Sequence, residues 1–349
     1  MINWNDLGFE YTDTDYIVRC SYHNGEWGKL VATRRKEINL HVAATVLQYG
    51  QEAFEGLKAV RGIDGKVRIF RMLENCRRLA RSCEALYMAP VPEQLFEEAI
   101  LLTLKKNIRY LPPYGSGASL YFRPMVICTT PRLGVGPGWD YEFIVYASPI
   151  GTYFKGGFHS TPFILSRRVD RAAPYGTGQY KVGGNYAAAF RATEPAHERG
   201  CGSMFLDSRY HRFIDECGAA NFFGIKPLKV AEGKRDNEKN VSGYEFVTPR
   251  SLSILPSITN DSLMTIATDA GMKVSRRRVP LSELREFTEC AACGTASVVS
   301  PISKVIDEDR HVTYNFSETP GPVCSMLYNT LLGIMRGELP DKYNWCLIR

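Results

Sequence analysis

Runs of β-branched and aromatic residues predict several strands along the chain. The two longest are SLYFRPMVICTT (119–130) and YEFIVYAS (141–148), joined by the Gly/Pro-rich loop PRLGVGPGWD. Alternation of residue types within them is typical of strands with one buried face. Shorter runs of the same kind follow at 162–168, 203–207, 212–216 and 221–226.

Apolar residues at helical spacing predict helices between these strands. One covers 72–86 ahead of Pro90, and another covers 93–109. Together with the strands, they predict an α/β protein with mixed α and β structure.

Two further helices are expected in the second half of the chain. The first, 185–200, should begin at Asn185, and Pro195 should kink or shorten it. The next should be capped by Thr259 or Asn260 and end at Gly271.

A Gly-rich stretch near the middle, GTYFKGGFHSTP (151–162), is the best candidate for a linker. A length of 349 residues corresponds to about two domains at roughly 150 residues each. We therefore expect a small N-terminal α/β domain at 1–154, a linker at 155–163 and a larger C-terminal domain at 164–349. Clefts at domain interfaces are favoured ligand sites, so we expect the active site between the domains.

Composition excludes several classes of protein. Hydrophobic residues make up 44% and charged residues 23%, which is close to the average of globular proteins and rules out a largely disordered chain. No run approaches the roughly 18 apolar residues of a membrane span, and the start resembles no signal peptide. A net charge of +6 on this length gives no case for nucleic acid. We expect a cytoplasmic protein.

The ten cysteines are irregularly spaced and are expected to be reduced. Cys290-Ala-Ala-Cys293 leaves three alternatives open: buried inert thiols, a redox pair or a metal site. A zinc site would need a second pair of ligands, and the sequence offers none at suitable spacing. We therefore expect no metal.

Four short patterns carry possible chemistry. Lys181 lies between Tyr180 and two glycines, where a close-packed backbone could desolvate the amine and make it a nucleophile for a carbonyl. Glu216 enters an apolar strand, which is costly unless the carboxylate meets a cation. LPSIT (255–259) precedes a helix, and CGTAS (293–297) is a turn of small residues; both can present N–H groups to an anion.

Each pattern taken alone has an ordinary structural explanation, as a surface lysine, an edge carboxylate, a helix cap or a tight turn. Together they supply a lysine, a carboxylate and two anion-binding turns. That set suits pyridoxal phosphate, which carries an aldehyde, a basic ring nitrogen and a phosphate.

The same four sites lie within a longer resemblance. In chain order, the motifs YGQEAFEGLKAVR, FRMLENCRRL, LYFRP, RLGVGPG, YKVGGNYA, IDECGAANFF, TPRSLSILPSIT and ECAACGTASVVSPI closely resemble the branched-chain amino acid aminotransferases. These are two-domain pyridoxal-phosphate enzymes of fold type IV. The resemblance spans most of the chain and implies a ping-pong reaction between L-leucine, L-isoleucine or L-valine and 2-oxoglutarate.

The resemblance assigns cofactor roles by position. Lys181 is similar to the Schiff-base lysine, Glu216 to the partner of the pyridine nitrogen and Tyr186 to the partner of the phenolic oxygen. The groups implied to hold the phosphate are Arg78, the backbone of Ile258 and Thr259, and Thr295.

The resemblance also implies a substrate pocket. The amides of Thr295 and Ala296 with the Tyr121 hydroxyl should bind the α-carboxylate, and Arg123 should meet the γ-carboxylate of glutamate. The side-chain pocket is implied to have Tyr49, Phe54, Tyr153 and Tyr186 as walls. In the family, residues like Tyr49, Leu133 and Val135 complete the pocket of the other subunit, which implies at least a homodimer.

Three positions depart from the family pattern. Ala219 stands where many relatives have Thr, and Ser257 replaces the usual Gly of the phosphate turn. Some relatives carry a redox Cys pair just after the G-T-A turn, where this chain has Ser297 and Ser300.

Two kinds of alternative remain at this stage. One is another fold-type IV enzyme, a D-amino acid aminotransferase or an aminodeoxychorismate lyase, disfavoured by the pair Tyr121 and Arg123 and by the long N-terminal segment. The other is a non-catalytic pyridoxal-phosphate binding module, disfavoured by the intact Lys181, Glu216 and Arg123.

Overall fold

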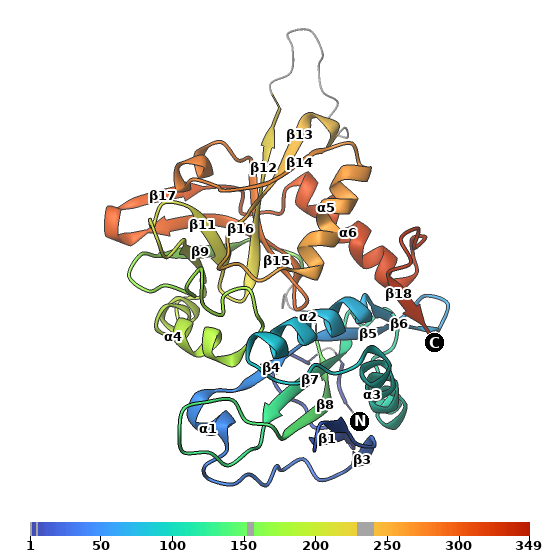
Figure 1. The fold of residues 1–349 in the computed structure, drawn as a ribbon. Coiled ribbons are helices and arrows are strands. Elements are labelled where there is room, and N and C mark those ends of the chain that lie inside the picture. The colour runs from blue at the N-terminus through green and yellow to red at the C-terminus, as the bar shows by residue number, and fades with distance from the viewer. Residues whose placement is uncertain (1, 5, 152–156, 229–240) are drawn as a thin grey trace. The chain divides into compact units, whose positions relative to one another are not determined.

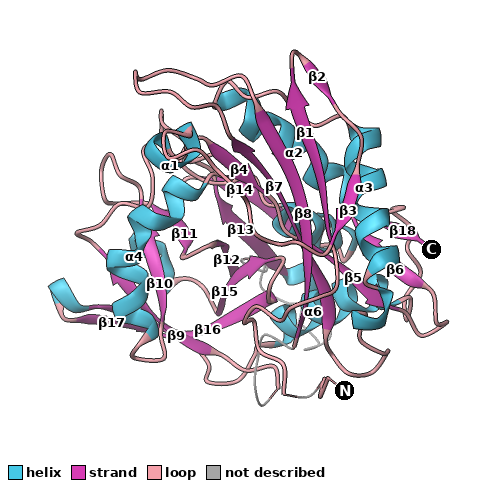
Figure 2. Ribbon diagram, turned by 90° about the horizontal axis from the view of Figure 1, so that it is seen from below, coloured by secondary structure: helices cyan, strands magenta, loops and turns pink. Residues whose placement is uncertain are grey.

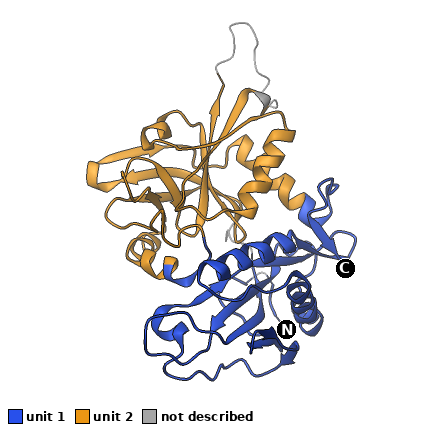
Figure 3. Ribbon diagram, viewed as in Figure 1, with its two compact units in different colours: residues 1–155, 180–184, 334–349 blue, residues 156–179, 185–333 orange. Residues whose placement is uncertain are grey.

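The computed structural model describes residues 2–4, 6–151, 157–228 and 241–349 (Figure 1). The chain divides into two compact units, coloured separately in Figure 3. Unit 1 contains residues 1–155, 180–184 and 334–349, and unit 2 contains 156–179 and 185–333. Tyr153, expected in the substrate pocket, lies outside the described residues.

Unit 1 is built on one antiparallel sheet with strand order β18-β6-β5-β7-β8-β1-β2, to which β3 adds at β1 and β4 at β7. Its centre is the pair predicted from the two longest apolar runs, which align over their whole length. The strands are β1 (Ile17–His23), β2 (Glu26–Trp27), β3 (Val31–Thr33), β4 (Glu52–Phe54), β5 (Leu57–Arg61), β6 (Val67–Phe70), β7 (Ser119–Cys128), β8 (Tyr141–Ile150) and β18 (Cys346–Ile348).

Two helices pack with this sheet into one core (Figure 2). They are α2 (Met72–Ala85) and α3 (Glu93–Lys106), as the helical spacing predicts; a short helix, α1 (Thr45–Tyr49), precedes β4. Cys76, Leu79 and Cys83 of α2 are fully buried against the sheet residues. This stripe fixes which face of α2 is turned inward.

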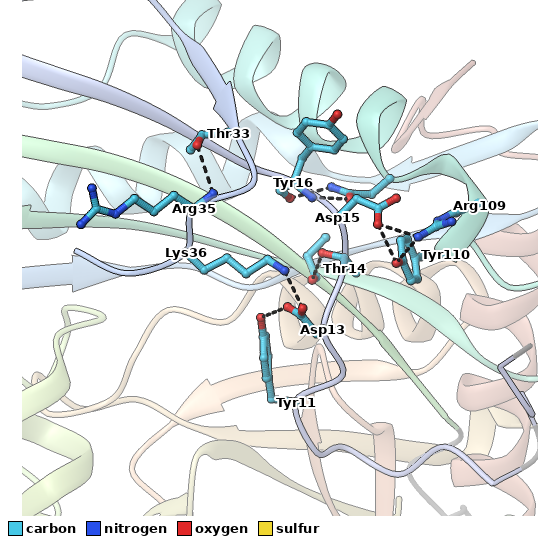
Figure 4. Close-up of polar contacts among 12 residues, drawn as sticks. Tyr11, Asp13, Thr14, Asp15, Tyr16, Thr33, Arg35, Lys36, Arg109 and Tyr110 are labelled. Carbon is cyan, nitrogen blue, oxygen red and sulfur yellow. Dashed lines mark hydrogen bonds and ion pairs between the residues drawn. The ribbon is translucent and has the colours of Figure 1, made fainter.

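The segment ahead of β1 is fastened to unit 1 by polar contacts (Figure 4). Asp13 accepts from Tyr11 at 2.7 Å and pairs with Lys36, while Asp15 pairs with Arg109. The Thr14 hydroxyl donates to the carbonyl of Ala147 on β8 at 3.0 Å. Exposed ion pairs contribute little, so the buried Thr14 contact is the firmer attachment.

In unit 2, six strands close on themselves. The order β11-β10-β9-β16-β15-β12 returns to β11, and β13 and β14 extend the sheet from β12. Closure leaves these six strands without open edges. The strands are β9 (Thr161–Ser166), β10 (Gly202–Leu206), β11 (Ile214–Cys217), β12 (Ala220–Pro227), β13 (Tyr244–Pro249), β14 (Lys273–Arg277), β15 (Glu289–Gly294), β16 (Val298–Asp307) and β17 (Val312–Asn315).

The helices of the second half differ from the prediction at their starts. α4 (Gly183–His197) begins two residues before Asn185, whose side chain instead bonds Thr177, and Pro195 lies in its last turn. α5 (Ile258–Asp269) is capped by Ser257, whose hydroxyl accepts from the Asn260 N–H at 3.1 Å. The predicted caps Thr259 and Asn260 are therefore wrong, because both already lie inside the helix. The last long helix is α6 (Pro322–Arg336).

Cys290 and Cys293 lie three residues apart on the extended strand β15 and pair with Gly224 and Asn221 of β12. Such a separation is about 10 Å, beyond the roughly 7 Å limit for a disulfide. Burial raises the pKa of both thiols far above the usual range. The geometry thus favours inert thiols over a redox pair.

No helix in the described part of the chain is long and apolar enough to cross a membrane. The described residues also contain no group of three or more His, Cys, Asp or Glu side chains arranged to hold a metal ion.

Candidate active site

Tyr121 and Arg123 lie on the same face of β7, as their spacing predicts. An Arg123 Nη2–H donates to the Tyr121 hydroxyl at 3.2 Å. That hydroxyl occupies the space above Gly56, where a Cβ atom would lie only 1.8 Å from it. Gly56 is thus required at this position, because any side chain would displace the Tyr121 ring.

The ring of Phe54 lies close to both Arg123 and Lys181. The guanidinium carbon of Arg123 lies 4.8 Å from the centre of the Phe54 ring, and the Lys181 Nζ lies 4.7 Å from it. Cations at such distances are attracted to the ring face. Three residues that the sequence analysis placed in one site, Phe54, Arg123 and Lys181, are therefore neighbours within unit 1.

The backbone around Lys181 is held on both sides. The Phe54 N–H donates to the Lys181 carbonyl at 3.0 Å, and the Lys181 N–H donates to the Ser82 hydroxyl at 2.9 Å. Two residues on, the Gly183 N–H donates to the Glu52 carboxylate, and Val182 is buried in the core. These contacts fix the direction in which the lysine leaves the chain.

Glu52 occupies the space beside Gly183. A Cβ on Gly183 would lie 2.1 Å from Glu52 Oε1, whereas one on Gly184 would meet nothing within 4 Å. Burial raises the pKa of Glu52, against the opposing effects of the Gly183 N–H and Arg123. The close backbone approach expected at the two glycines thus occurs at the first one only.

Arg78 is buried on α2 and forms a two-point ion pair with Glu55. The Nε–Oε1 and Nη2–Oε2 distances are 2.6 and 2.9 Å. Burial would raise the pKa of Glu55, but the charge and hydrogen bonds of Arg78, with the charge of Lys181, hold it below its usual value. Two of the five guanidinium N–H groups of Arg78 serve this pair, which fixes the plane of its head group.

Tyr49 is joined to the loop that follows β7. Its hydroxyl donates to the carbonyl of Leu133 at 2.5 Å. The Leu133 and Val135 side chains on this loop are 85% and 87% exposed. The three residues expected to serve a second subunit thus lie together in unit 1, with two apolar side chains turned to solvent.

In unit 2, the Glu216 carboxylate is buried and held on both oxygens. Arg171 Nε lies 2.5 Å from Oε2. Oε1 accepts from Asn221 Nδ2 at 3.1 Å and from the Leu255 N–H at 3.0 Å. The cationic partner that a carboxylate in an apolar strand requires is therefore Arg171.

The two expected anion-binding turns also lie in unit 2. Ile258 and Thr259 form the first turn of α5, where backbone N–H groups gather. Thr295 and Ala296 form the turn between β15 and β16. Ser257 has φ −84°, so the Gly usual in the family is not needed for this geometry.

The candidate residues divide between the units. Unit 1 contains Tyr49, Phe54, Arg78, Tyr121, Arg123, Leu133, Val135 and Lys181, and unit 2 contains Tyr186, Glu216, Ile258, Thr259, Thr295 and Ala296.

The sequence patterns do not mark the residues that hold these groups in place. Glu55, Glu52 and Arg171 belong to this second set. A signal existed for Glu55, because it is a carboxylate in the apolar run FEGLKAV and calls for a cation as Glu216 does.

Comparison with known proteins places the chain among aminotransferases. A family model described as amino-transferase class IV matches residues 52–305. The branched-chain-amino-acid aminotransferase of Helicobacter pylori is 43% identical, over 99% of this chain and 97% of that protein. That of Haemophilus influenzae is 40% identical, over 99% and 98%.

A solved structure gives the same result. The Escherichia coli branched-chain amino acid aminotransferase superposes with a TM-score of 0.77 at 25% identity, covering 96% of this chain and 99% of that one. A T.th. enzyme of the same name, solved with pyridoxamine 5'-phosphate, gives 0.75 at 25% identity, with 96% and 98% covered. The similarity therefore extends over both units.

Proposed function

The chain belongs to the class IV aminotransferases, and from this premise we propose how its residues carry out the transamination of branched-chain amino acids. Its two half-reactions exchange an amino group between L-leucine, L-isoleucine or L-valine and 2-oxoglutarate. The observation that carries the residue assignment is the fixed Lys181 backbone beside Phe54 and Arg123.

The residues present fit pyridoxal phosphate, which supplies an aldehyde that exchanges amines and a ring that withdraws electrons. Glu216, with both oxygens held, would face the ring nitrogen and keep it protonated. Arg78, oriented by Glu55, would hold the phosphate with the first turn of α5 and Thr295. Tyr186 on α4 would bond the phenolic oxygen.

Lys181 would bind the cofactor and then act on the proton of the substrate Cα. With its amine free, Lys181 would accept that proton as a general base and later give it up as a general acid. The Phe54 ring beside Nζ gives this amine an apolar surrounding. Because hydrogen bonds hold its backbone in place, the Lys181 side chain would reach the same position when it accepts the proton and when it gives the proton up.

Tyr121 and Arg123 would give the pocket its two specificities. The Tyr121 hydroxyl, with the amides of Thr295 and Ala296, would bind the α-carboxylate. Arg123 contacts the Phe54 and Tyr121 rings, and these contacts would remain when an aliphatic side chain is bound. It would pair with the γ-carboxylate when glutamate is bound.

We propose that the active enzyme is at least a homodimer whose pocket is shared. The exposed Leu133 and Val135 are the residues that would enter the partner's pocket, and Tyr49 holds their loop through the Leu133 carbonyl. Two apolar side chains on a loop tip are costly to leave in water, which supports their burial by a second copy. All ten cysteines are free, which supports function in a reducing compartment such as the cytoplasm.

A substrate panel tests the function. We expect turnover of L-leucine, L-isoleucine and L-valine with 2-oxoglutarate, and none of D-amino acids. Lys181→Ala should lower turnover by several orders of magnitude, because nucleophile and proton carrier disappear together. The exposed Lys105→Ala serves as a matched control. Turnover of D-amino acids alone, or near-normal turnover by Lys181→Ala, would contradict the proposal.

A further inference from the structure

A pocket of about 650 Å³ lies within unit 2 and is lined by none of the residues assigned above to cofactor or substrate. Its volume is within the range of small-molecule sites. Its walls come from residues within the segments 174–179, 207–215 and 250–256 and from two arginines near the end of β14. Arg276 is the last but one residue of that strand, and Arg278 is the first residue after it.

The walls carry an excess of positive charge. Four arginines and two aspartates line the pocket; the arginines are Arg209, Arg250, Arg276 and Arg278. Side chains alternate along an extended chain, so Arg276 and Arg278 share one face. Arg277 turns to the other face, where its Nη1 donates to Glu283 at 2.8 Å. Among the described residues, the four pocket arginines form no ion pair.

The first aspartate keeps its negative charge, but its oxygens are already held by the backbone. Asp207 accepts the backbone N–H groups of Tyr210, Arg212 and Phe213 at 2.7–2.9 Å. These bonds hold the pKa of Asp207 below its usual value, although burial would raise it. Its carboxylate thus stabilises the turn that presents Arg209.

The second aspartate is buried behind the pocket wall. Asp215 is only 4% exposed, and its Oδ2 accepts from the Ser253 hydroxyl. Its buried Oδ1 has no hydrogen-bond partner in the described part of the chain. An oxygen that water cannot touch is also closed to a ligand, so the arginines and aromatic rings are the groups of this pocket that can bind one.

Aromatic side chains complete the wall. Tyr175 is 86% exposed, and Tyr210 and Phe213 line the same pocket beneath Arg209 and Arg278. A simple dicarboxylate has no planar surface for these rings. We propose that this pocket binds a nucleotide, with its phosphates on the arginines and its base against the tyrosines.

Isothermal titration of the holoenzyme with ATP and ADP tests this proposal. Bound pyridoxal phosphate keeps the cofactor's own phosphate site filled. We expect saturable binding that weakens with added salt, as attraction between exposed charges does. The double variant Arg276→Gln/Arg278→Gln should weaken binding on the order of tenfold or more.

The matched control is Arg285→Gln/Arg310→Gln, which removes two exposed charges of unit 2 outside the pocket and should leave binding unchanged. Tripolyphosphate and adenosine, each lacking one half of a nucleotide, should bind more weakly than ATP. No binding of ATP or ADP, equal binding of tripolyphosphate, or equal losses in both double variants would overturn the proposal.

Discussion

Arg123 is placed so that its charge is tolerated whether or not a substrate carboxylate is present. Its guanidinium lies against two rings and donates to the Tyr121 hydroxyl. Such contacts partly replace water, which lowers the cost of covering the charge with an aliphatic substrate side chain. One residue can therefore serve both half-reactions.

Arg123→Met should separate the two half-reactions. Loss of a charge-assisted hydrogen bond, about 1.5–3 kcal/mol, should lower kcat/KM for glutamate and 2-oxoglutarate roughly 10 to 100-fold. The leucine half-reaction should change much less. Stopped-flow absorbance of each half-reaction measures this, with the exposed Arg81→Met as a matched control. Equal losses on both sides would assign Arg123 a structural role instead.

Burial also decides the chemistry of the cysteines. Eight of the ten are buried, and only Cys201 and Cys346 are partly exposed. Burial raises the pKa of Cys346 to about 12, which leaves little thiolate near neutral pH. We expect Cys201 to react first with an aromatic disulfide reagent under native conditions, and Cys201→Ser to remove this fast phase. A disulfide between Cys290 and Cys293 after mild oxidation would contradict the inert assignment.

At the scale of elements, the start of α4 holds the lysine in place. β4 begins at Glu52, whose carboxylate accepts the Gly183 N–H, so the start of the strand meets the start of the helix two residues after Lys181. Gly183 and Gly184 are the first two residues of α4, and their surroundings differ. That difference gives a matched pair of substitutions.

Gly183→Ala should push Glu52 away and release the lysine backbone. We expect a loss of stability of about 1–3 kcal/mol from overpacking and a fall in kcat on the order of tenfold or more. Gly184→Ala meets open space and should be neutral or stabilising by up to about 1 kcal/mol. Thermal unfolding and single-turnover rates measure both variants. If the two behave alike, the Glu52 contact does not position Lys181.

At the scale of the whole molecule, a shared pocket predicts that two defective chains can repair each other. Lys181→Ala removes the lysine, and Leu133→Ser/Val135→Ser removes the loop contribution. In a mixed dimer, one of the two sites would contain the intact lysine of one chain and the intact loop of the other.

We therefore expect mixing of the two variants after dissociation to restore leucine activity, up to about a quarter of the wild-type value if chains pair at random. Each variant alone, treated in the same way, is the control. Mixed samples no more active than the sum of the two variants would show that the pocket is not shared across subunits.

Local sequence determined much of the secondary structure and the positions of the candidate site residues along the chain. The strand pair β7–β8 and the helices α2 and α3 follow from residue patterns that need no distant partner. The spacing of Tyr121 and Arg123 likewise placed both on one face, because alternation is a property of the strand itself.

Only the tertiary structure decided which residues pair with the buried charged side chains. Arg78 meets Glu55 from 23 residues away, Glu216 meets Arg171, and residues 180–184 return to unit 1 between two segments of unit 2. The cap of α5 at Ser257 was also settled by the folded backbone. Contacts of this kind depend on how distant segments pack. A one-dimensional pattern therefore marks a buried charge as needing a partner but does not say which residue the fold brings to it.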